Sequence, residues 1–455
     1  MSIHDSICLL NKYEVKNSLA KINIKSVSIN SRDISDGEMF IGIIGDNFDG
    51  NVFYKDAVLK GASIVVIDKR SPIAKELKNE AETPYILVDD SITFLQELAK
   101  EHLIRWKSKG GKVICITGSN GKTTTKEMLT FFLKNQYGEC IASTKGNMNN
   151  HIGTPLTILS ILDSDIFAVI EIGTNAPGEI RDLSSLSMPD IGIITSVGES
   201  HLEKLGSVEG VFEEKTSLFE YIIKSSSKDS LEDSCFFPKS GLLENLNDSI
   251  YYVPVEKNIN FFINDNGSYN LKIFDENFAL KNSNIIGEYN FMNLSLAISA
   301  ALKLGMNPDL IKIVLSEFKP HSSRSEWSSF QNVNVFHDYY NANPSSMKNA
   351  ISAFIDAIDI SLINCLFVIG DMYELGEDSH RYHQELGEFM KLHGISNVIY
   401  VGKYHDAFAI GFGKKVLNFQ SSDSACLSNL IGNSIKYVFV KGSRGVQLEK
   451  IFIDD

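Results

Sequence analysis

The chain has 455 residues and a formal net charge of −14, because 57 aspartate and glutamate residues outnumber 43 lysine and arginine residues. With 43% hydrophobic and 22% charged residues it has the composition of a globular protein, and at roughly 100 to 200 residues per domain we expect three domains. The negative charge argues against a nucleic-acid partner, and the lack of a long apolar run or an N-terminal signal pattern argues for a cytoplasmic protein without membrane insertion.

A small N-terminal α/β domain is predicted for residues 1–108. Short apolar stretches with strand composition alternate with polar turns at 24–29, 39–44, 62–67 and 85–88. Apolar residues at helical spacing then predict an amphipathic helix from Ser91 to Lys107, with Ser91 as its N-cap. Ser31 and Arg32 follow the first strand and make a candidate pocket for a small anion or a base.

A phosphate-binding loop opens the second predicted domain, residues 109–318. An apolar strand, a turn with two glycines and a helical apolar pattern follow one another here. Loop N–H groups and Lys122 would face phosphate oxygens, and the Thr123 hydroxyl is suited to ligate Mg²⁺. Ile116 stands where the general pattern has glycine, so the loop is a shorter form. The loop residues assigned to a nucleotide are Gly118, Ser119, Asn120, Gly121, Lys122, Thr123 and Thr124.

Two further strand ends supply candidate metal ligands in this central domain. Its alternation of strands and helices predicts a parallel sheet with crossover helices. Glu171 ends one predicted strand, and His201 follows the next one along the chain. Ligands of open α/β sheets bind beyond the carboxyl ends of the strands. We therefore expect Thr123, Glu171 and His201 to converge on one metal–phosphate site.

A third domain, residues 319–455, is predicted to be a doubly wound α/β domain. Short apolar strands alternate there with helical stretches, at 333–338, 365–369, 398–401 and 437–440. The last part of the central domain, residues 224–285, begins with a polar stretch and continues in short alternating apolar runs. This pattern predicts a small β-rich insertion.

Seven ordered segments resemble the Mur ligases, and among them the MurF type. They are TGSNGKTT (117–124), TKGNMNNHIGTPLTIL (144–159), EIGTNAPGEI (171–180), ESHLEKLGSVEGVFEEK (199–215), GEYNFMN (287–293), HDYYNANPSSM (337–347) and GDMYELGEDSHRYH (370–383). The resemblance implies three domains, which bind the UDP-linked substrate, ATP and a further ligand in turn. It also implies an ATP- and Mg²⁺-dependent ligase that adds D-alanyl-D-alanine to a UDP-N-acetylmuramoyl tripeptide through an acyl phosphate, in peptidoglycan precursor synthesis.

The same resemblance implies roles for single residues. Lys122, Lys215 and His201 are the candidate catalytic residues, and Lys215 matches the lysine that Mur ligases carbamylate. The implied metal ligands are Thr123, Glu171, His201 and the carbamylated Lys215. Beyond the loop, ATP would contact Asn290, Asn293, Arg324, Asp338 and Asn341. Ser31 and Arg32 would contact the uridine nucleotide, while Asn149 and Asn150 would face the muramoyl peptide.

Other functions remain open at this point. A different Mur ligase or a folylpolyglutamate-synthase-like ligase would share the phosphate loop and the segment around Glu171. A P-loop switch ATPase is least favoured. Such a protein normally has an apolar strand that ends in an aspartate, which binds the metal, whereas the corresponding strand here ends in Glu171, with glycine at position 173. We expect a monomer with no nucleic-acid partner.

Overall fold

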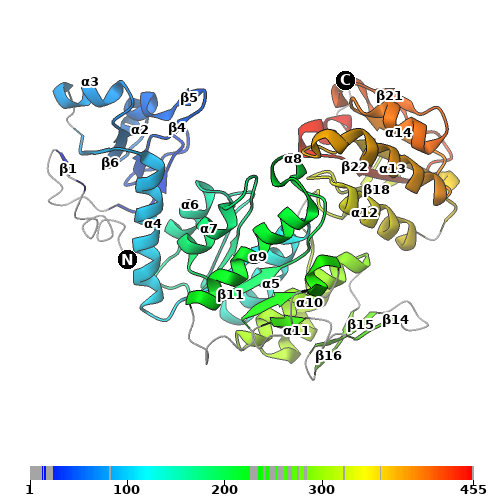
Figure 1. The fold of residues 1–455 in the computed structure, drawn as a ribbon, viewed down its shortest axis with the longest axis horizontal. Helices are drawn as coiled ribbons and strands as arrows, with labels where there is room; N and C mark the ends of the chain where they lie inside the picture. The colour runs from blue at the N-terminus through cyan, green and yellow to red at the C-terminus, as the bar shows by residue number, and fades with distance from the viewer. Residues whose placement is uncertain are drawn as a thin grey trace.

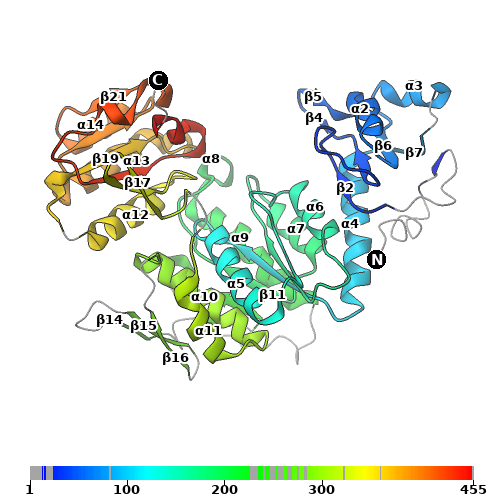
Figure 2. The ribbon, with the colours of Figure 1, turned by 180° about the vertical axis from the view of Figure 1, so that it is seen from behind.

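The computed structural model describes residues 24–80, 83–225, 284–320, 323–358 and 360–452. It also describes residues 13, 15–16, 234–238, 241–245, 252–254, 260–263, 269–273 and 276–280. Three bodies follow one another along the chain, and the first and third stand apart on the same side of the second (Figures 1 and 2). None of the described helices is long and apolar enough to cross a membrane.

The N-terminal body is a five-stranded sheet in the order β1-β7-β6-β3-β2, parallel except for β1. Its strands are β1 (Val15–Lys16), β2 (Val27–Ser28), β3 (Met39–Ile41), β6 (Ile64–Asp68) and β7 (Tyr85–Val88), with a separate ribbon of β4 (Ile44–Gly45) and β5 (Phe48–Asp49). Its helices are α2 (Tyr54–Leu59), α3 (Ile73–Glu80) and α4 (Ser91–Lys107). The predicted N-cap of α4 was wrong by one residue: the Asp90 carboxylate accepts the Thr93 N–H, and Ser91 is the first helical residue.

Helix α4 connects the N-terminal body to the central one. Phe94, Leu98 and Trp106 on its apolar face are buried in one cluster with strand residues of both bodies. The Trp106 Nε1–H donates to the carbonyl of Asp165 at 2.9 Å, which satisfies the polar end of this buried ring. The helix therefore belongs to two cores at once.

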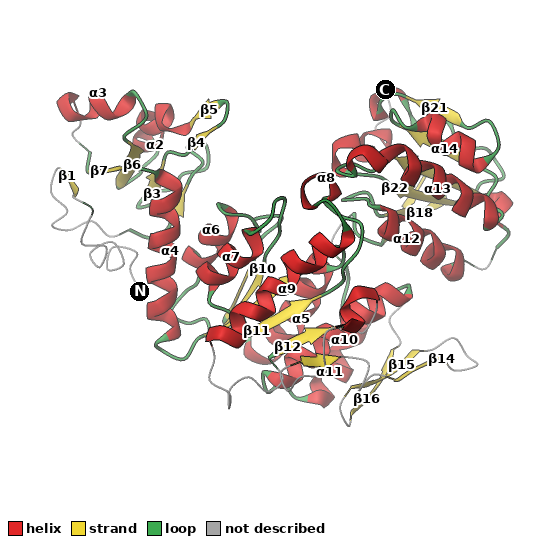
Figure 3. Cartoon of the chain, viewed as in Figure 1, coloured by secondary structure: helices red, strands yellow, loops and turns green. Residues whose placement is uncertain are grey.

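The central body is a six-stranded, fully parallel sheet in the order β13-β12-β11-β8-β10-β9. Helices cover both of its faces (Figure 3). Successive side chains of a strand point to opposite faces of the sheet, and these strands are apolar on both faces, so each face needs a covering layer. In β8, Val113 and Cys115 pack with α4, α6, α7 and α9, whereas Ile114 and Ile116 pack with α5, α10 and α11. The strands are β8 (Lys112–Thr117), β9 (Ile141–Ser143), β10 (Phe167–Glu171), β11 (Ile191–Ile194), β12 (Cys235–Phe237) and β13 (Tyr252–Pro254). The helices are α5 (Lys122–Tyr137), α6 (Gly153–Leu159), α7 (Glu179–Ser187), α8 (Leu202–Leu205), α9 (Val208–Ser225), α10 (Glu288–Lys303) and α11 (Pro308–Val314).

The predicted β-rich insertion is described only in part. Its first two strands, β12 and β13, extend the central parallel sheet. The other three form a small antiparallel sheet, namely β14 (Asn260–Ile263), β15 (Tyr269–Ile273) and β16 (Glu276–Leu280). The remainder of the insertion lies outside the described residues.

The C-terminal body is a six-stranded sheet in the order β17-β18-β22-β19-β20-β21, parallel except for the β17–β18 hairpin. Its strands are β17 (Glu326–Phe330), β18 (Val333–His337), β19 (Cys365–Gly370), β20 (Val398–Val401), β21 (Leu417–Phe419) and β22 (Tyr437–Lys441). Helices α12 (Pro344–Ala357), α13 (Ser379–Leu392) and α14 (His405–Phe412) cover one face, and short 3-10 turns cover the other. The predicted α/β class is confirmed, while the boundaries at residues 108 and 318 stay predictions.

Candidate functional site

The phosphate loop joins β8 to α5, and its two glycines are required by both conformation and space. Gly118 and Gly121 have positive φ angles of 149° and 84°. A Cβ atom on Gly118 would lie 2.0 Å from the Thr195 hydroxyl, and one on Gly121 would lie 2.2 Å from Oδ1 of Asn293. Any side chain at either position would force the loop away from β11 or α10.

The loop is held by the segment that follows strand β11. Ser119 Oγ donates to the Gly198 carbonyl at 3.0 Å, and the Asn120 N–H donates to Ser196 Oγ at 2.9 Å. Lys122 Nζ folds back onto the Gly118 carbonyl at 2.7 Å. Burial lowers the pKa of Lys122, and the nearby carboxylate of Glu171 opposes that shift. The loop thus presents a cation that is short of solvent, which suits it to anionic phosphate oxygens. Thr124 follows in the first turn of α5, partly buried.

Glu171 joins the phosphate loop to the predicted peptide-facing segment. One carboxylate oxygen accepts the Thr123 hydroxyl at 2.7 Å, and the other accepts the Asn149 amide at 2.8 Å. The side chain is buried at the end of β10, and its backbone N–H donates to Thr144 Oγ1 at 2.9 Å. The structure therefore brings together three of the predicted site residues: Thr123, Glu171 and Asn149.

His201 is directed toward the C-terminal body. Its Nδ1 lies 2.6 Å from Oε2 of Glu374, and both residues have positive φ angles. The contact with His201 is the main reason that the pKa of Glu374 lies below its ordinary value. Among the described residues, no three His, Cys, Asp or Glu side chains are grouped as a metal site. His201 is thus paired across the domain boundary, and only its Nε2 stays free of Glu374.

Lys215 is buried on α9, with 1% of its surface exposed. Burial, followed by the charge of Lys122, holds the pKa of Lys215 well below its ordinary value. The adjacent Glu214 accepts the N–H groups of Gly178 and Ile180 at 2.6 and 2.7 Å. Lys215 is therefore not a solvated helical lysine, and its environment disfavours the charged form of the amine.

Asn290 and Asn293 lie on α10, beside the phosphate loop. Both side chains are buried, and Asn293 packs directly against Gly121. Asn293 Nδ2 donates to Asn290 Oδ1 at 3.4 Å, and Asn290 donates to the Ile286 carbonyl at 3.0 Å. The Asn290 amide also lies 3.5 Å from Ser325 Oγ, so the pair is held by the turn before α10 and by the start of the C-terminal body.

Arg324, Asp338 and Asn341 lie together at the start of the C-terminal body. The Arg324 guanidinium is 3.7 Å from the centre of the Tyr340 ring. Lys441 donates to the Asp338 carboxylate at 2.6 Å and to the Asn341 carbonyl at 3.0 Å. The Asn341 side chain accepts the N–H of the next residue at 2.9 Å, so it turns back onto its own loop.

Three family models match the three bodies in order. Residues 116–301 match the Mur ligase middle domain, residues 23–103 the Mur ligase family catalytic domain, and residues 323–443 the Mur ligase glutamate ligase domain. The chain is 34% identical over 446 residues to the UDP-N-acetylmuramoyl-tripeptide–D-alanyl-D-alanine ligase of Bacillus subtilis, covering 95% of this chain and 93% of the relative. The chain belongs to the Mur ligase family.

Solved structures match this Mur ligase over nearly its whole length. MurF of Acinetobacter baumannii has 25% identity and a TM-score of 0.83, covering 98% of this chain and 97% of that one. MurF of Thermotoga maritima, solved in complex with ADP, has 25% identity and a TM-score of 0.77, covering 94% and 96%. The predicted three-domain layout and the MurF-type resemblance are confirmed.

An amide pair between domains in this Mur ligase was not predicted from sequence. Asn343 Nδ2 donates to Asn120 Oδ1 at 2.9 Å, and Asn120 Nδ2 donates back to Asn343 Oδ1 at 3.3 Å and to Ser345 Oγ at 3.0 Å. Asn343 also caps α12, where it accepts the Ser346 N–H at 2.8 Å. In the sequence, Asn343 stands in the segment HDYYNANPSSM, directly before a proline, and this pattern indicates a helix start without showing a contact with the phosphate loop. The phosphate loop is therefore bonded directly to the C-terminal domain.

The predicted nucleotide-sugar contacts lie outside this cluster. Ser31 and Arg32 occupy the turn after β2, where Arg32 is exposed. Asn150 Oδ1 accepts the N–H groups of Ile152 and Gly153 at 3.1 and 2.8 Å, and so orders the start of α6. The structure places Ser31 and Arg32 in the N-terminal domain and Asn150 beside the Glu171 network.

Proposed function

We propose that this Mur ligase uses ATP and Mg²⁺ to join D-alanyl-D-alanine to the terminal carboxylate of a UDP-N-acetylmuramoyl tripeptide, in peptidoglycan precursor synthesis. The Bacillus subtilis relative carries the name of this activity. The observation that carries the proposal is the double contact of Glu171, which bonds Thr123 of the phosphate loop and Asn149 of the peptide-facing segment. A nucleotide on the loop and a carboxylate at Asn149 would meet beside Glu171.

The oxygen atoms around Glu171 fit a magnesium ion. The ion is usually held by one or two protein oxygens together with waters and substrate phosphates. The Thr123 hydroxyl and the Glu171 carboxylate are 2.7 Å apart and provide such a pair. His201 and a carbamylated Lys215 are the further ligands that we assign. Mg²⁺ bound here would neutralise charge on the phosphates during transfer.

The chain's own residues would activate and position the substrates. Lys122 and the loop N–H groups spread the charge of the γ-phosphoryl group as the substrate carboxylate attacks it. A carboxylate oxygen–phosphorus bond forms and the bond to ADP breaks, giving an acyl phosphate. The deprotonated amine of the dipeptide then attacks the acyl carbon, the carbon–oxygen bond to phosphate breaks, and the nitrogen releases a proton as the amide forms.

The C-terminal domain would complete this site by closing on the loop. The Asn120–Asn343 and His201–Glu374 contacts both cross from the central domain to the C-terminal one. Closure brings Arg324 and Asp338 to the nucleotide and excludes water, which would otherwise hydrolyse an acyl phosphate. We also propose that the enzyme acts as a monomer, and the need for ATP supports a cytoplasmic location.

Phosphate release by the purified full-length chain tests this function. We expect release only when ATP, Mg²⁺, the UDP-linked tripeptide and D-alanyl-D-alanine are all present. Turnover with a single amino acid on a shorter UDP-linked peptide would assign another Mur ligase type, and turnover with glutamate on a folate would assign the folylpolyglutamate-synthase type. Steady phosphate release without any amine would contradict the proposal and favour a switch ATPase.

A further inference from the structure

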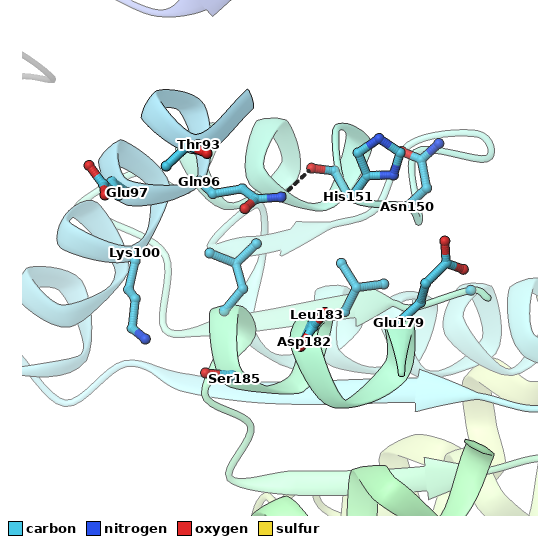
Figure 4. Close-up of a pocket in the computed structure, with 12 residues that line it drawn as sticks. Thr93, Gln96, Glu97, Lys100, Asn150, His151, Glu179, Asp182, Leu183 and Ser185 are labelled. Atoms are coloured by element: carbon cyan, nitrogen blue, oxygen red, sulfur yellow. Dashed lines mark hydrogen bonds between the residues drawn. The ribbon is translucent and has the colours of Figure 1, made fainter. Parts of the chain in front are cut away.

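A cavity of about 360 Å³ lies between α4 and α7, on the peptide-facing side of the central domain (Figure 4). Asn150 and Glu179 line one end of it, while Lys100 of α4 points toward the other end near Ser185. The Gln96 amide bridges the two walls by donating to the His151 carbonyl at 3.1 Å. Residues of two domains therefore line one open cavity, which combines polar side chains with the apolar Leu183 and Leu186.

Two opposite charges at the edge of the cavity, both exposed to solvent, have no partner within the described part of the chain. Among the described residues, no hydrogen bond or ion pair is formed by the side chain of Lys100 or by that of Asp182, which both line it. Glu179 differs, because its Oε2 accepts the N–H groups of Asn175 and Ala176 at 2.5 and 3.1 Å. A ligand that carries both a carboxylate and an ammonium group could pair with Lys100 and Asp182 together.

The cavity also adjoins the assigned reaction centre. Gly173, which lines it, donates its N–H to the Asn149 carbonyl at 2.8 Å, and the Asn149 amide donates to Glu171. Only Ile172 separates Gly173 from Glu171, and two residue steps of extended chain span about 7 Å. A group attached to the reacting carboxylate can therefore reach the cavity.

We propose that this cavity receives the side chain of the third peptide residue, the one whose carboxylate is activated. The proposal rests on the function assigned above. Lys100 binds a carboxylate at the end of that side chain and Asp182 binds an ammonium group there. The cavity accordingly favours a diamino dicarboxylic acid such as diaminopimelate over lysine, whose side chain ends in an ammonium group alone.

Binding of two UDP-N-acetylmuramoyl tripeptides to the full-length enzyme tests the assignment by calorimetry, without turnover. One tripeptide ends in diaminopimelate and the other in lysine. Lys100→Met should weaken binding of the diaminopimelate form about fivefold and leave the lysine form unchanged, since an exposed ion pair is lost. Asp182→Asn should weaken both. Lys75→Met, at an exposed lysine of α3, is the matched control and should change neither.

Each other outcome has a definite meaning. Equal weakening of both tripeptides by Lys100→Met would overturn the assignment, because the cavity would then hold a part that they share. An unchanged affinity ratio in both cavity variants would overturn it as well. Thermal midpoints like those of the parent enzyme would show that the variants are folded. Failure of ligation in the phosphate-release assay would refute the function, whereas these binding ratios test the cavity separately.

Discussion

Replacing Asn343 by serine should weaken closure of the C-terminal domain while keeping α12 intact. Serine is a good N-cap residue, so the bond to the Ser346 N–H can be kept. Its hydroxyl is too short to replace an amide that exchanges two hydrogen bonds with Asn120, at 2.9 and 3.3 Å. The variant therefore separates the contact between domains from the cap.

The expected loss follows from those two bonds. A neutral hydrogen bond contributes about 0.5 to 1.5 kcal/mol net, so the pair contributes about 1 to 3 kcal/mol to the closed arrangement. This corresponds to roughly a fivefold to 150-fold fall in kcat/KM if closure is required for transfer, since about 1.4 kcal/mol is tenfold. Asn343→Ala should additionally lower the free energy of unfolding by about 1 kcal/mol, because it removes the cap.

A double-mutant cycle with Asn120→Ala gives the decisive comparison. If the two amides act on each other, the double variant should lose less than the sum of the single losses. Steady-state ligation gives the kinetic losses, and urea unfolding checks that Asn343→Ser keeps its stability. Fully additive losses, or an Asn343→Ser variant with unchanged kcat/KM, would refute the idea that this contact couples closure to the phosphate loop.

Three further predictions concern single side chains. Lys122→Ala should abolish ligation in a folded protein. If the variant kept more than about a tenth of kcat, Lys122 would stabilise the transition state by less than about 1.4 kcal/mol, which would contradict its assigned role. Lys215→Ala should be inactive and partly rescued by short-chain carboxylates, whereas a fully active Lys215→Arg would contradict a carbamate. Burial lowers the pKa of His383, whose Nε2 accepts the Met372 N–H. As the pH falls, the imidazole of the unfolded chain is therefore protonated before that of the folded chain. The free energy of unfolding should accordingly decrease below about pH 6.5. Urea midpoints at pH 7.5 and 5.5 should therefore differ less in His383→Gln than in the parent, and equal differences would refute this.

The phosphate loop and the Glu171 end of β10 could be predicted because local patterns determine them. An apolar strand, two glycines and a lysine fix one turn, and parallel strands bring their carboxyl ends to one edge. The N-cap of α4 was misplaced because Asp90 and Ser91 are both good caps, and sequence does not decide between neighbours.

The contacts between domains could not be predicted in the same way. Glu374 was read only as part of a family motif, and its pairing with His201 depends on how two separate domains dock. The assignment of α4 to one domain missed its second role, since a helix pattern shows an apolar face without showing what covers it. Strands β17 and β21 were also missed, because three of the five residues of EWSSF are polar and LNF is only three residues long.

Transfer of isotope from the substrate carboxylate tests the central claim most directly. The terminal carboxylate of the UDP-N-acetylmuramoyl tripeptide would be labelled with ¹⁸O and turned over with ATP, Mg²⁺ and D-alanyl-D-alanine. If the carboxylate attacks the γ-phosphate, one labelled oxygen must leave with inorganic phosphate for each amide formed. Mass spectrometry should find that label in the phosphate. Amide formation with unlabelled phosphate, or phosphate released without amide, would contradict the account.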